Sequence, residues 1–219
     1  IKLLIASSYI ISGIGMYLWA KEEFGKIPGF TAALLYLFAP FHLSEMHFRV
    51  SVGMIVAFAV VPFIFYFCKK TLSANNILFI VLGAISITLL ILSHITIATI
   101  TLPLIFSYCL FTIMKKDKKK LALLKISVML LLGLSLASYY IIPAITEVKY
   151  TWYSQGVLIG VTPRPFFEYI YSSSFFGFLF QGRHGEYLLV VGYAQLLVFF
   201  LAIIQLLTAR NKKSKIKPI

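Results

Sequence analysis

The sequence predicts an all-α membrane protein, a polytopic transmembrane helical bundle with about seven spans. Two features of the composition predict this class: 60% of the 219 residues are hydrophobic and only 12% are charged. Soluble domains are about 45–50% apolar and about 25% charged, so a soluble fold of this length could not bury so much apolar surface. We therefore expect lipid to be the solvent for most of the chain.

Seven apolar segments approach the roughly 20 residues that a helix needs to cross the hydrocarbon core. We expect spans at residues 1–20, 27–43, 50–68, 77–92, 96–114, 121–142 and 188–207. The fourth and fifth spans share one apolar run, Ile77–Met114, which would form a helix of about 57 Å in a core of about 30 Å, so we place a break at Ser93–Thr96. Pro143 is expected to end the sixth span, whereas Pro62 and Pro103 lie inside spans and are expected to kink them.

The apolar first segment is expected to be a span and not a signal peptide, because it lacks a basic start and a small-residue cleavage site. The chain begins at Ile1, and we expect it to be a piece of a longer protein with a single transmembrane domain over 1–219. Cys68 and Cys109 show no metal or disulfide spacing and are expected to be buried small side chains. Gly13 and Gly15 are expected to be close-packing positions.

The distribution of basic residues predicts the orientation of the chain in its membrane. If the turns 21–26, 69–76 and 115–120 and the tail 209–219 are cytoplasmic, 15 of the 20 basic residues face that side, with Lys125 included. The other side keeps Lys2, Arg49, Lys149, Arg164 and Arg183. This bias follows the positive-inside rule. We therefore expect the net charge of +13 to serve membrane topology and contact with anionic lipid, and not the binding of nucleic acid. The aromatic-rich loop 144–187 is then extracytoplasmic, with an interfacial or re-entrant helix.

The segment 40–49 is the densest group of ionisable residues on the outer side. If it is helical, His42, Glu45 and Arg49 lie on one face, and His47 points away from it. One interpretation is a site for an anionic or phosphorylated ligand, with Arg49 holding phosphate and His42 or Glu45 acting as acid, base or metal ligand. The other is a solvated interfacial turn in which Glu45 and Arg49 neutralise each other.

Other polar residues of the outer side are weaker candidates. His94, at the predicted break, either contacts a ligand or caps a helix. Glu147 follows the sixth span and either acts as a general base, if it is partly buried, or pairs with Lys149. Arg183 and His184 belong to a polar turn that is either a ligand loop or an ordinary solvated turn. No cofactor motif and no close metal-ligand spacing appear, so we expect no cofactor, although a divalent metal stays open.

Several short motifs resemble those of one family. Ala32–Leu43 is followed by Arg49, by a span that carries Val61-Pro62, by Leu92-Ser93-His94 in an outer turn, and by Pro143–Glu147 before a long loop. This order resembles the bacterial membrane proteins known as 6-pyruvoyl-tetrahydropterin synthase-related, which are similar in turn to the multi-spanning C-type (GT-C) glycosyltransferases.

The resemblance implies a transferase that takes a sugar from a polyprenyl-phosphate donor at the extracytoplasmic face, for cell-envelope glycans. It implies that Arg49, His94 and Glu147 line the donor or acceptor site. One departure concerns the catalytic acid, which such enzymes carry in the first outer loop: Asp117 is the only aspartate here and lies on the predicted inner side. The acidic residue that often follows the arginine is also missing. Pterin chemistry finds no support, since it would need a soluble zinc site of clustered histidines.

Three hypotheses follow from the sequence. The first is a glycosyltransferase-like enzyme in which Glu147 acts as base and Arg49 stabilises the leaving phosphate. The second is a non-catalytic binder or transporter of lipid-linked glycans; the near absence of charge at the centres of the spans argues against ion-coupled transport. The third is a structural membrane protein. Membrane lipids are expected partners in all three cases.

Overall fold

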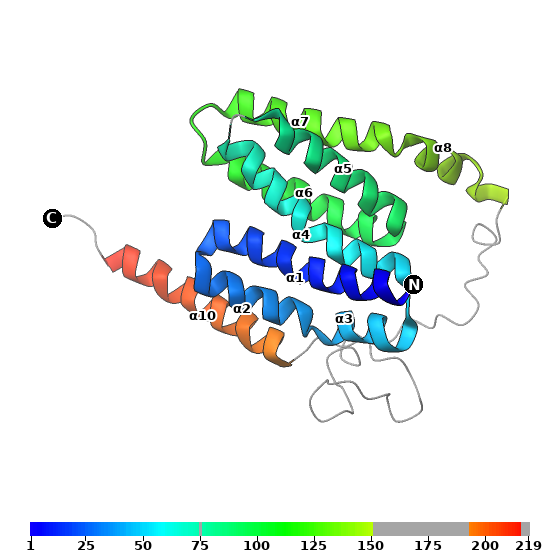
Figure 1. Cartoon of the computed structure of the whole chain (residues 1–219). Helices are drawn as coiled ribbons and strands as arrows, with labels where there is room; N and C mark the ends of the chain where they lie inside the picture. Colours follow the sequence, from blue (N-terminus) through cyan, green and yellow to red (C-terminus); the bar gives the residue numbers. More distant parts are fainter. Residues whose placement is uncertain (75, 151–192, 216–219) are drawn as a thin grey trace. The chain divides into compact units, whose positions relative to one another are not determined.

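The structure, a computed structural model, describes residues 1–74, 76–150 and 193–215. Every regular element in these ranges is a helix (Figure 1), which confirms the all-α class. The elements are α1 (Lys2–Phe24), α2 (Lys26–Leu37), α3 (Pro40–Ser44), η1 (Glu45–Arg49), α4 (Val52–Ser73), α5 (Ile77–Ser93), α6 (Ile95–Met114), α7 (Lys119–Leu136), α8 (Ser138–Thr146), η2 (Val148–Tyr150) and α10 (Tyr193–Lys215).

The chain forms two compact units. The larger contains Ile1–Leu37 and Val50–Pro163, and the smaller contains Phe38–Arg49 and Arg164–Ile219. In the larger unit α1 packs on α2 and α4, α4 packs on α5 and α6, and α5 packs on α7 (Figure 1). Its core is built from fully buried apolar side chains of α4 to α7, among them Ile64, Ile87, Leu90, Ile105 and Met129.

Glycines allow close approach in the α1 layer, as the sequence predicts. A methyl group added at Gly13 would lie 2.7 Å from the side chain of Leu37, and one added at Gly15 would lie 2.7 Å from the ring of Phe63. Between α1 and α2, Gly25 adopts a φ of 96°, a left-handed conformation that glycine reaches without strain. This turn lets α2 fold back along α1.

The break between α5 and α6 confirms the predicted division of the run Ile77–Met114. α5 ends at Ser93, α6 begins at Ile95, and His94 between them is extended. Pro62 lies inside α4 and Pro103 inside α6, also as predicted. The predicted burial of Cys68 and Cys109 is confirmed as well.

Two predicted spans are wrong in their internal structure. The segment 27–43 is not one helix, because Ala39 is extended before Pro40, the first residue of α3. A proline disfavours the helical conformation of the residue before it.

The segment 121–142 bends by 64° between α7 and α8. Pro143 does not end this span, since it lies inside α8. A proline ring disturbs the turn that precedes it, so the break falls upstream at Ala137.

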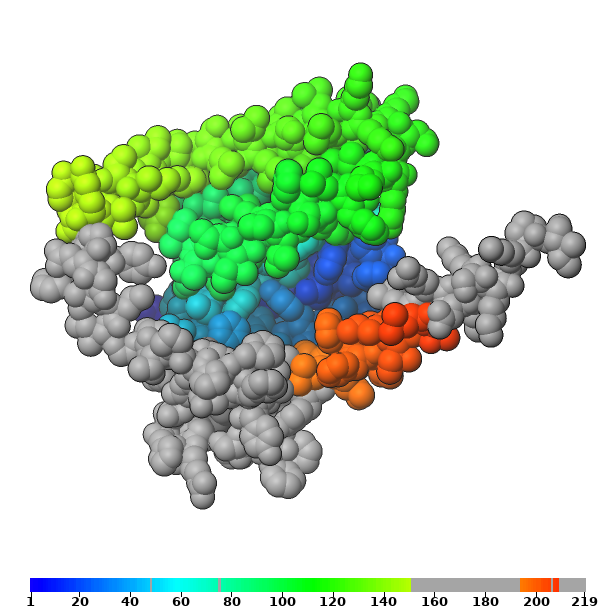
Figure 2. Space-filling view, turned by 180° about the vertical axis from the view of Figure 1, so that it is seen from behind, coloured from blue at the N-terminus to red at the C-terminus, as the bar shows by residue number. Residues whose placement is uncertain are grey.

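The described residues contain three helices that are long and apolar enough to cross a membrane, namely α1, α4 and α6, or up to five spans if each bent pair counts as one. α5 and residues Ala194–Gln205 of α10 are apolar but shorter. This supports a membrane protein with three to five spans, and seven spans stay a prediction. Figure 2 shows α6 and α7 as a broad green face. Leu104 and Phe111 of α6 and Leu124 and Leu131 of α7 are exposed, as expected for helices in lipid.

The lysine-rich turns of the larger unit lie at one end, on the left of Figure 1. Lys70 Nζ lies 2.7 Å from Glu22 Oε1, and Lys69 Nζ lies 2.9 Å from Glu23 Oε2, which ties the end of α4 to the end of α1. Tyr108 of α6 also donates a hydrogen bond to Glu23. His94 begins α6 at the other end of this unit, about 30 Å of helix away.

Candidate functional site

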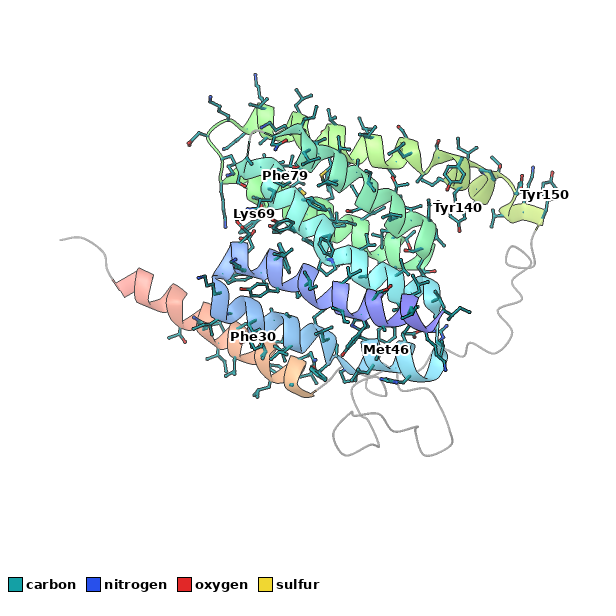
Figure 3. The ribbon with its side chains drawn as sticks, in the orientation of Figure 1. Phe30, Met46, Lys69, Phe79, Tyr140 and Tyr150 are labelled. Carbon is teal, nitrogen blue, oxygen red and sulfur yellow. The ribbon has the colours of Figure 1, made fainter. Side chains whose placement is uncertain are left out.

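The candidate segment 40–49 is a short α-helix that widens into a π-helical segment. α3 begins with Pro40 at its first position and ends at Ser44, and η1 continues it to Arg49 (Figure 3, where Met46 marks the segment). π-Helical turns are rare, and they occur frequently at functional sites. The turn brings Arg49 Nη1 to 3.1 Å from Glu45 Oε1. The predicted pairing of these two residues is therefore observed.

Glu45 and Arg49 differ sharply in exposure. The side chain of Glu45 is 1% exposed and that of Arg49 is 51% exposed. The guanidinium stabilises the buried carboxylate, because an ionised group that is removed from water needs a counter-charge. The solvated-turn interpretation does not fit a buried Glu45. His42 is buried as well, whereas His47 is exposed.

The guanidinium of Arg49 keeps donors for a second anion. Its bond to Glu45 is the one hydrogen bond that it makes to the described part of the chain, and a guanidinium carries five donors in a planar fork. Within the same part, Glu45 Oε2 is buried and has no hydrogen-bond partner. Glu45 thus holds one edge of the guanidinium, and the exposed edge has the geometry that binds carboxylate or phosphate.

Val50 follows this pair in a strained conformation. Its φ of 49° lies in the left-handed region, which a β-branched residue rarely adopts and which costs about 1–2 kcal/mol. Strain of this kind persists where the surrounding structure requires it, often beside functional groups. Sequence analysis missed Val50, because a valine carries no signal for a left-handed backbone.

His94 caps α6. Its Nδ1 accepts a hydrogen bond from the backbone N–H of Ile97 at 3.3 Å, so the neutral ring carries its proton on Nε2. The capping interpretation is therefore observed. The ring can offer a ligand its Nε2–H as a hydrogen-bond donor, but Nδ1 is occupied by the cap and cannot act as a base. Gly53 of α4 packs against this turn, where an added methyl group would overlap the carbonyl oxygen of Ser93.

Glu147 ends α8 and is exposed. The partial burial that would favour a general base is thus absent. Its carboxylate makes no ion pair within the described ranges, and Lys149 Nζ lies instead 4.9 Å from the centroid of the Tyr150 ring. Figure 3 labels Tyr140 of α8 and Tyr150 just beyond it. The catalytic role of Glu147 stays a prediction.

A family model spans these elements. The model of the 6-pyruvoyl-tetrahydropterin synthase related domain, described as a membrane protein, matches residues 2–215. The chain belongs to this family. Neither a curated protein nor a solved structure matches it significantly. Membership in the 6-pyruvoyl-tetrahydropterin synthase related family confirms the family named from the motifs, and it agrees with a membrane protein; the similarity to GT-C enzymes stays a prediction.

In this member of the 6-pyruvoyl-tetrahydropterin synthase related family, the candidate residues fall into separate groups. His42, Glu45 and Arg49 belong to the smaller unit, and His94 and Glu147 belong to the larger one. The predicted substrate-binding residues Arg183 and His184 lie outside the described residues. No group of three histidine, cysteine or acidic residues that could hold a metal occurs in the described part. The Glu45–Arg49 pair is therefore the best-defined candidate.

Proposed function

We propose that the protein is a membrane-embedded glycosyltransferase-like protein that acts on polyprenyl-phosphate-linked sugar at the extracytoplasmic face of a bacterial cytoplasmic membrane. The observation that carries the proposal is the half-exposed side chain of Arg49, whose Nη1 is bonded to the buried carboxylate of Glu45. A guanidinium fixed in this way binds phosphate through two parallel hydrogen bonds.

The position of the pair in the chain supports a lipid-linked substrate. Glu45 and Arg49 follow a break in an apolar helical segment, and irregular backbone in membrane proteins is tolerated where it is buried in protein or lines a cavity. Ionisable residues within membrane segments are rare and commonly mark the path or the site of a substrate. A polyprenyl phosphate joins an apolar chain to an anionic group, which matches an apolar segment that ends in an arginine.

The proposed chemistry, which follows from the resemblance of the sequence to GT-C enzymes, is a transfer at the anomeric carbon. The acceptor hydroxyl gives its proton to the Glu147 carboxylate, and its oxygen forms the new bond to the anomeric carbon. The bond from that carbon to the phosphate oxygen breaks, and Arg49 stabilises the charge on the leaving polyprenyl phosphate. His94 contributes a hydrogen-bond donor through Nε2 to a sugar or phosphate oxygen.

A second candidate is a binder of lipid-linked glycans without catalysis. Two observations favour it: Glu147 is exposed, and His94 Nδ1 is occupied as a helix cap. In this case the phosphate contact of Arg49 remains, but no side chain removes a proton.

The first test measures binding of decaprenyl phosphate to the full chain in lipid nanodiscs, with decaprenol as the uncharged comparison. We expect Arg49→Ala to weaken decaprenyl phosphate binding about tenfold or more, since a charge-assisted contact is worth about 1.5–3 kcal/mol. Arg49→Lys is expected to recover only part of the affinity because it lacks the planar fork. Lys149→Ala is the matched control and should bind like the wild type. Equal binding by Arg49→Ala and wild type would overturn the proposal.

The second test separates the enzyme from the binder. Membranes that contain the wild type or Glu147→Gln are supplied with radiolabelled decaprenyl-phosphate sugar, and transfer to envelope material is measured. Loss of transfer with unchanged decaprenyl phosphate binding in Glu147→Gln supports the enzyme. Equal transfer by both proteins removes Glu147 as the base.

A further inference from the structure

A cavity of about 430 Å³ lies at the lysine-rich end of the larger unit, between the end of α4 and the turn from α6 to α7. Lys69 marks this end of the bundle in Figure 3. The lining includes Lys116, Asp117, Lys118, Lys125, Leu72 and Leu121. None of these residues takes part in the function proposed above.

The charge of the cavity is positive. Three lysines and one aspartate line it, which gives a net charge of +2. Lys116 and Lys118 make no ion pair in the ranges that the structure describes, whereas Lys69 and Lys70 nearby are paired with Glu23 and Glu22. Lys116 and Lys118 are therefore not neutralised by an ion pair as Lys69 and Lys70 are, and the positive field that they create in the cavity attracts an anion.

The first turn of α7 adds backbone donors to these lysines. α7 begins at Lys119, its preceding residue Lys118 provides no side-chain cap, and the first turn contains no acidic residue. The first N–H groups of a helix have no acceptor within the helix, and they form the positive end of its dipole. Lysine side chains beside such N–H groups form a phosphate site.

We propose that this cavity binds the headgroup phosphate of an anionic phospholipid. Leu72 and Leu121 provide an apolar wall beside the charged groups, which a lipid glycerol and acyl chain would cover and a free phosphate ion would leave in contact with water. Basic pockets between transmembrane helices on the cytoplasmic side are known to take lipid headgroups. The lipid is thus specifically held at this cavity, beyond the general attraction of lysines for an anionic surface.

The test uses native mass spectrometry of the full chain in detergent, titrated with phosphatidylglycerol and with phosphatidylcholine. The cavity variant is Lys116→Gln, Lys118→Gln and Lys125→Gln combined. The matched control is Lys115→Gln, Lys119→Gln and Lys120→Gln, which removes the same number of positive charges from residues 115–120, outside the cavity lining. We expect the cavity variant to lose about tenfold or more in phosphatidylglycerol affinity and the control about twofold or less. Equal losses in both variants would overturn the proposal, since they would show unspecific attraction.

Two further measurements keep the result interpretable. Asp117→Asn removes the negative charge from the lining, so it should strengthen phosphatidylglycerol binding and leave phosphatidylcholine binding unchanged; weaker binding would contradict the site. Sodium phosphate at millimolar concentration is added as a competitor. Weak competition supports a lipid, and full displacement by free phosphate would overturn the assignment to a phospholipid.

Discussion

The Nδ1 atom of His94 accepts a hydrogen bond from the backbone N–H of Ile97 at 3.3 Å, and through this bond the imidazole begins α6. A histidine is an unusual helix cap, since asparagine, aspartate and serine serve this position better. Helix capping through Nδ1 and ligand contact through Nε2 are therefore two distinct roles of His94, and a pair of substitutions can measure them independently.

For His94, we expect His94→Ala to lower the free energy of unfolding by about 1 kcal/mol, because the N–H of Ile97 loses its acceptor. His94→Asn should restore this loss, since an asparagine side chain caps well. The measurement is unfolding in detergent followed by circular dichroism. If His94→Asn is stable but still defective in decaprenyl phosphate binding, the ring contributes a ligand contact through Nε2; normal binding would leave capping as its role.

For Gly53, we expect Gly53→Ala to destabilise the larger unit by about 1–3 kcal/mol, because its methyl group would overlap the Ser93 carbonyl oxygen, which belongs to backbone and cannot move alone. Gly13→Ala is the matched control. Its methyl group would meet the end of the Leu37 side chain, which can rotate away, so the loss should be smaller. Thermal unfolding of both variants in detergent checks the order, and a greater loss for Gly13→Ala would contradict the packing described.

For Glu23, we expect Glu23→Gln to destabilise the bundle by about 1–3 kcal/mol, because Tyr108 and Lys69 both direct hydrogen bonds to this carboxylate. The neighbouring Glu22→Gln removes only a more exposed pair with Lys70, and such pairs are worth about 0–1 kcal/mol. Chemical unfolding in detergent compares the two variants. Equal losses would show that the Glu23 cluster is no stronger than a surface ion pair.

For sidedness, we expect a cysteine at Ile95 to react with a membrane-impermeant maleimide in intact spheroplasts and a cysteine at Lys118 to react only after the cells are opened. Both substitutions are made in a chain with Cys68→Ala and Cys109→Ala, whose native thiols are buried. The physical reason is the positive-inside rule, which keeps the lysine-rich end in the cytoplasm. The reverse labelling pattern would place the proposed transferase chemistry on the wrong face.

Sequence reasoning located features that depend on local chemistry. The break at His94 was predictable because one helix over Ile77–Met114 would be about twice as long as the membrane core. The packing of Gly13 and the burial of Cys68 followed from small residues in apolar runs. The bends at Ala39 and Ala137 were not predicted, because hydropathy reports the solvent of a segment and not the path of its backbone.

For the Glu45–Arg49 pair too, the sequence predicted one feature and could not predict others. Spacing alone predicted that these residues meet, because side chains three or four positions apart share a helix face. Spacing could not predict that the turn is π-helical, that Glu45 is buried or that Val50 takes a positive φ. These properties depend on which other parts of the chain surround the turn.

By itself, the sequence determined the all-α class, the membrane setting, the family and the grouping of lysines in a few turns. Each of these follows from composition, from motif order or from the length of apolar runs, and needs no knowledge of tertiary contacts. Only the tertiary structure decided that Lys69 and Lys70 are paired while Lys116 and Lys118 line a cavity, and that Arg49 presents an open edge. Exposure and pairing depend on distances between segments far apart in the chain, and local pattern carries no information about those distances.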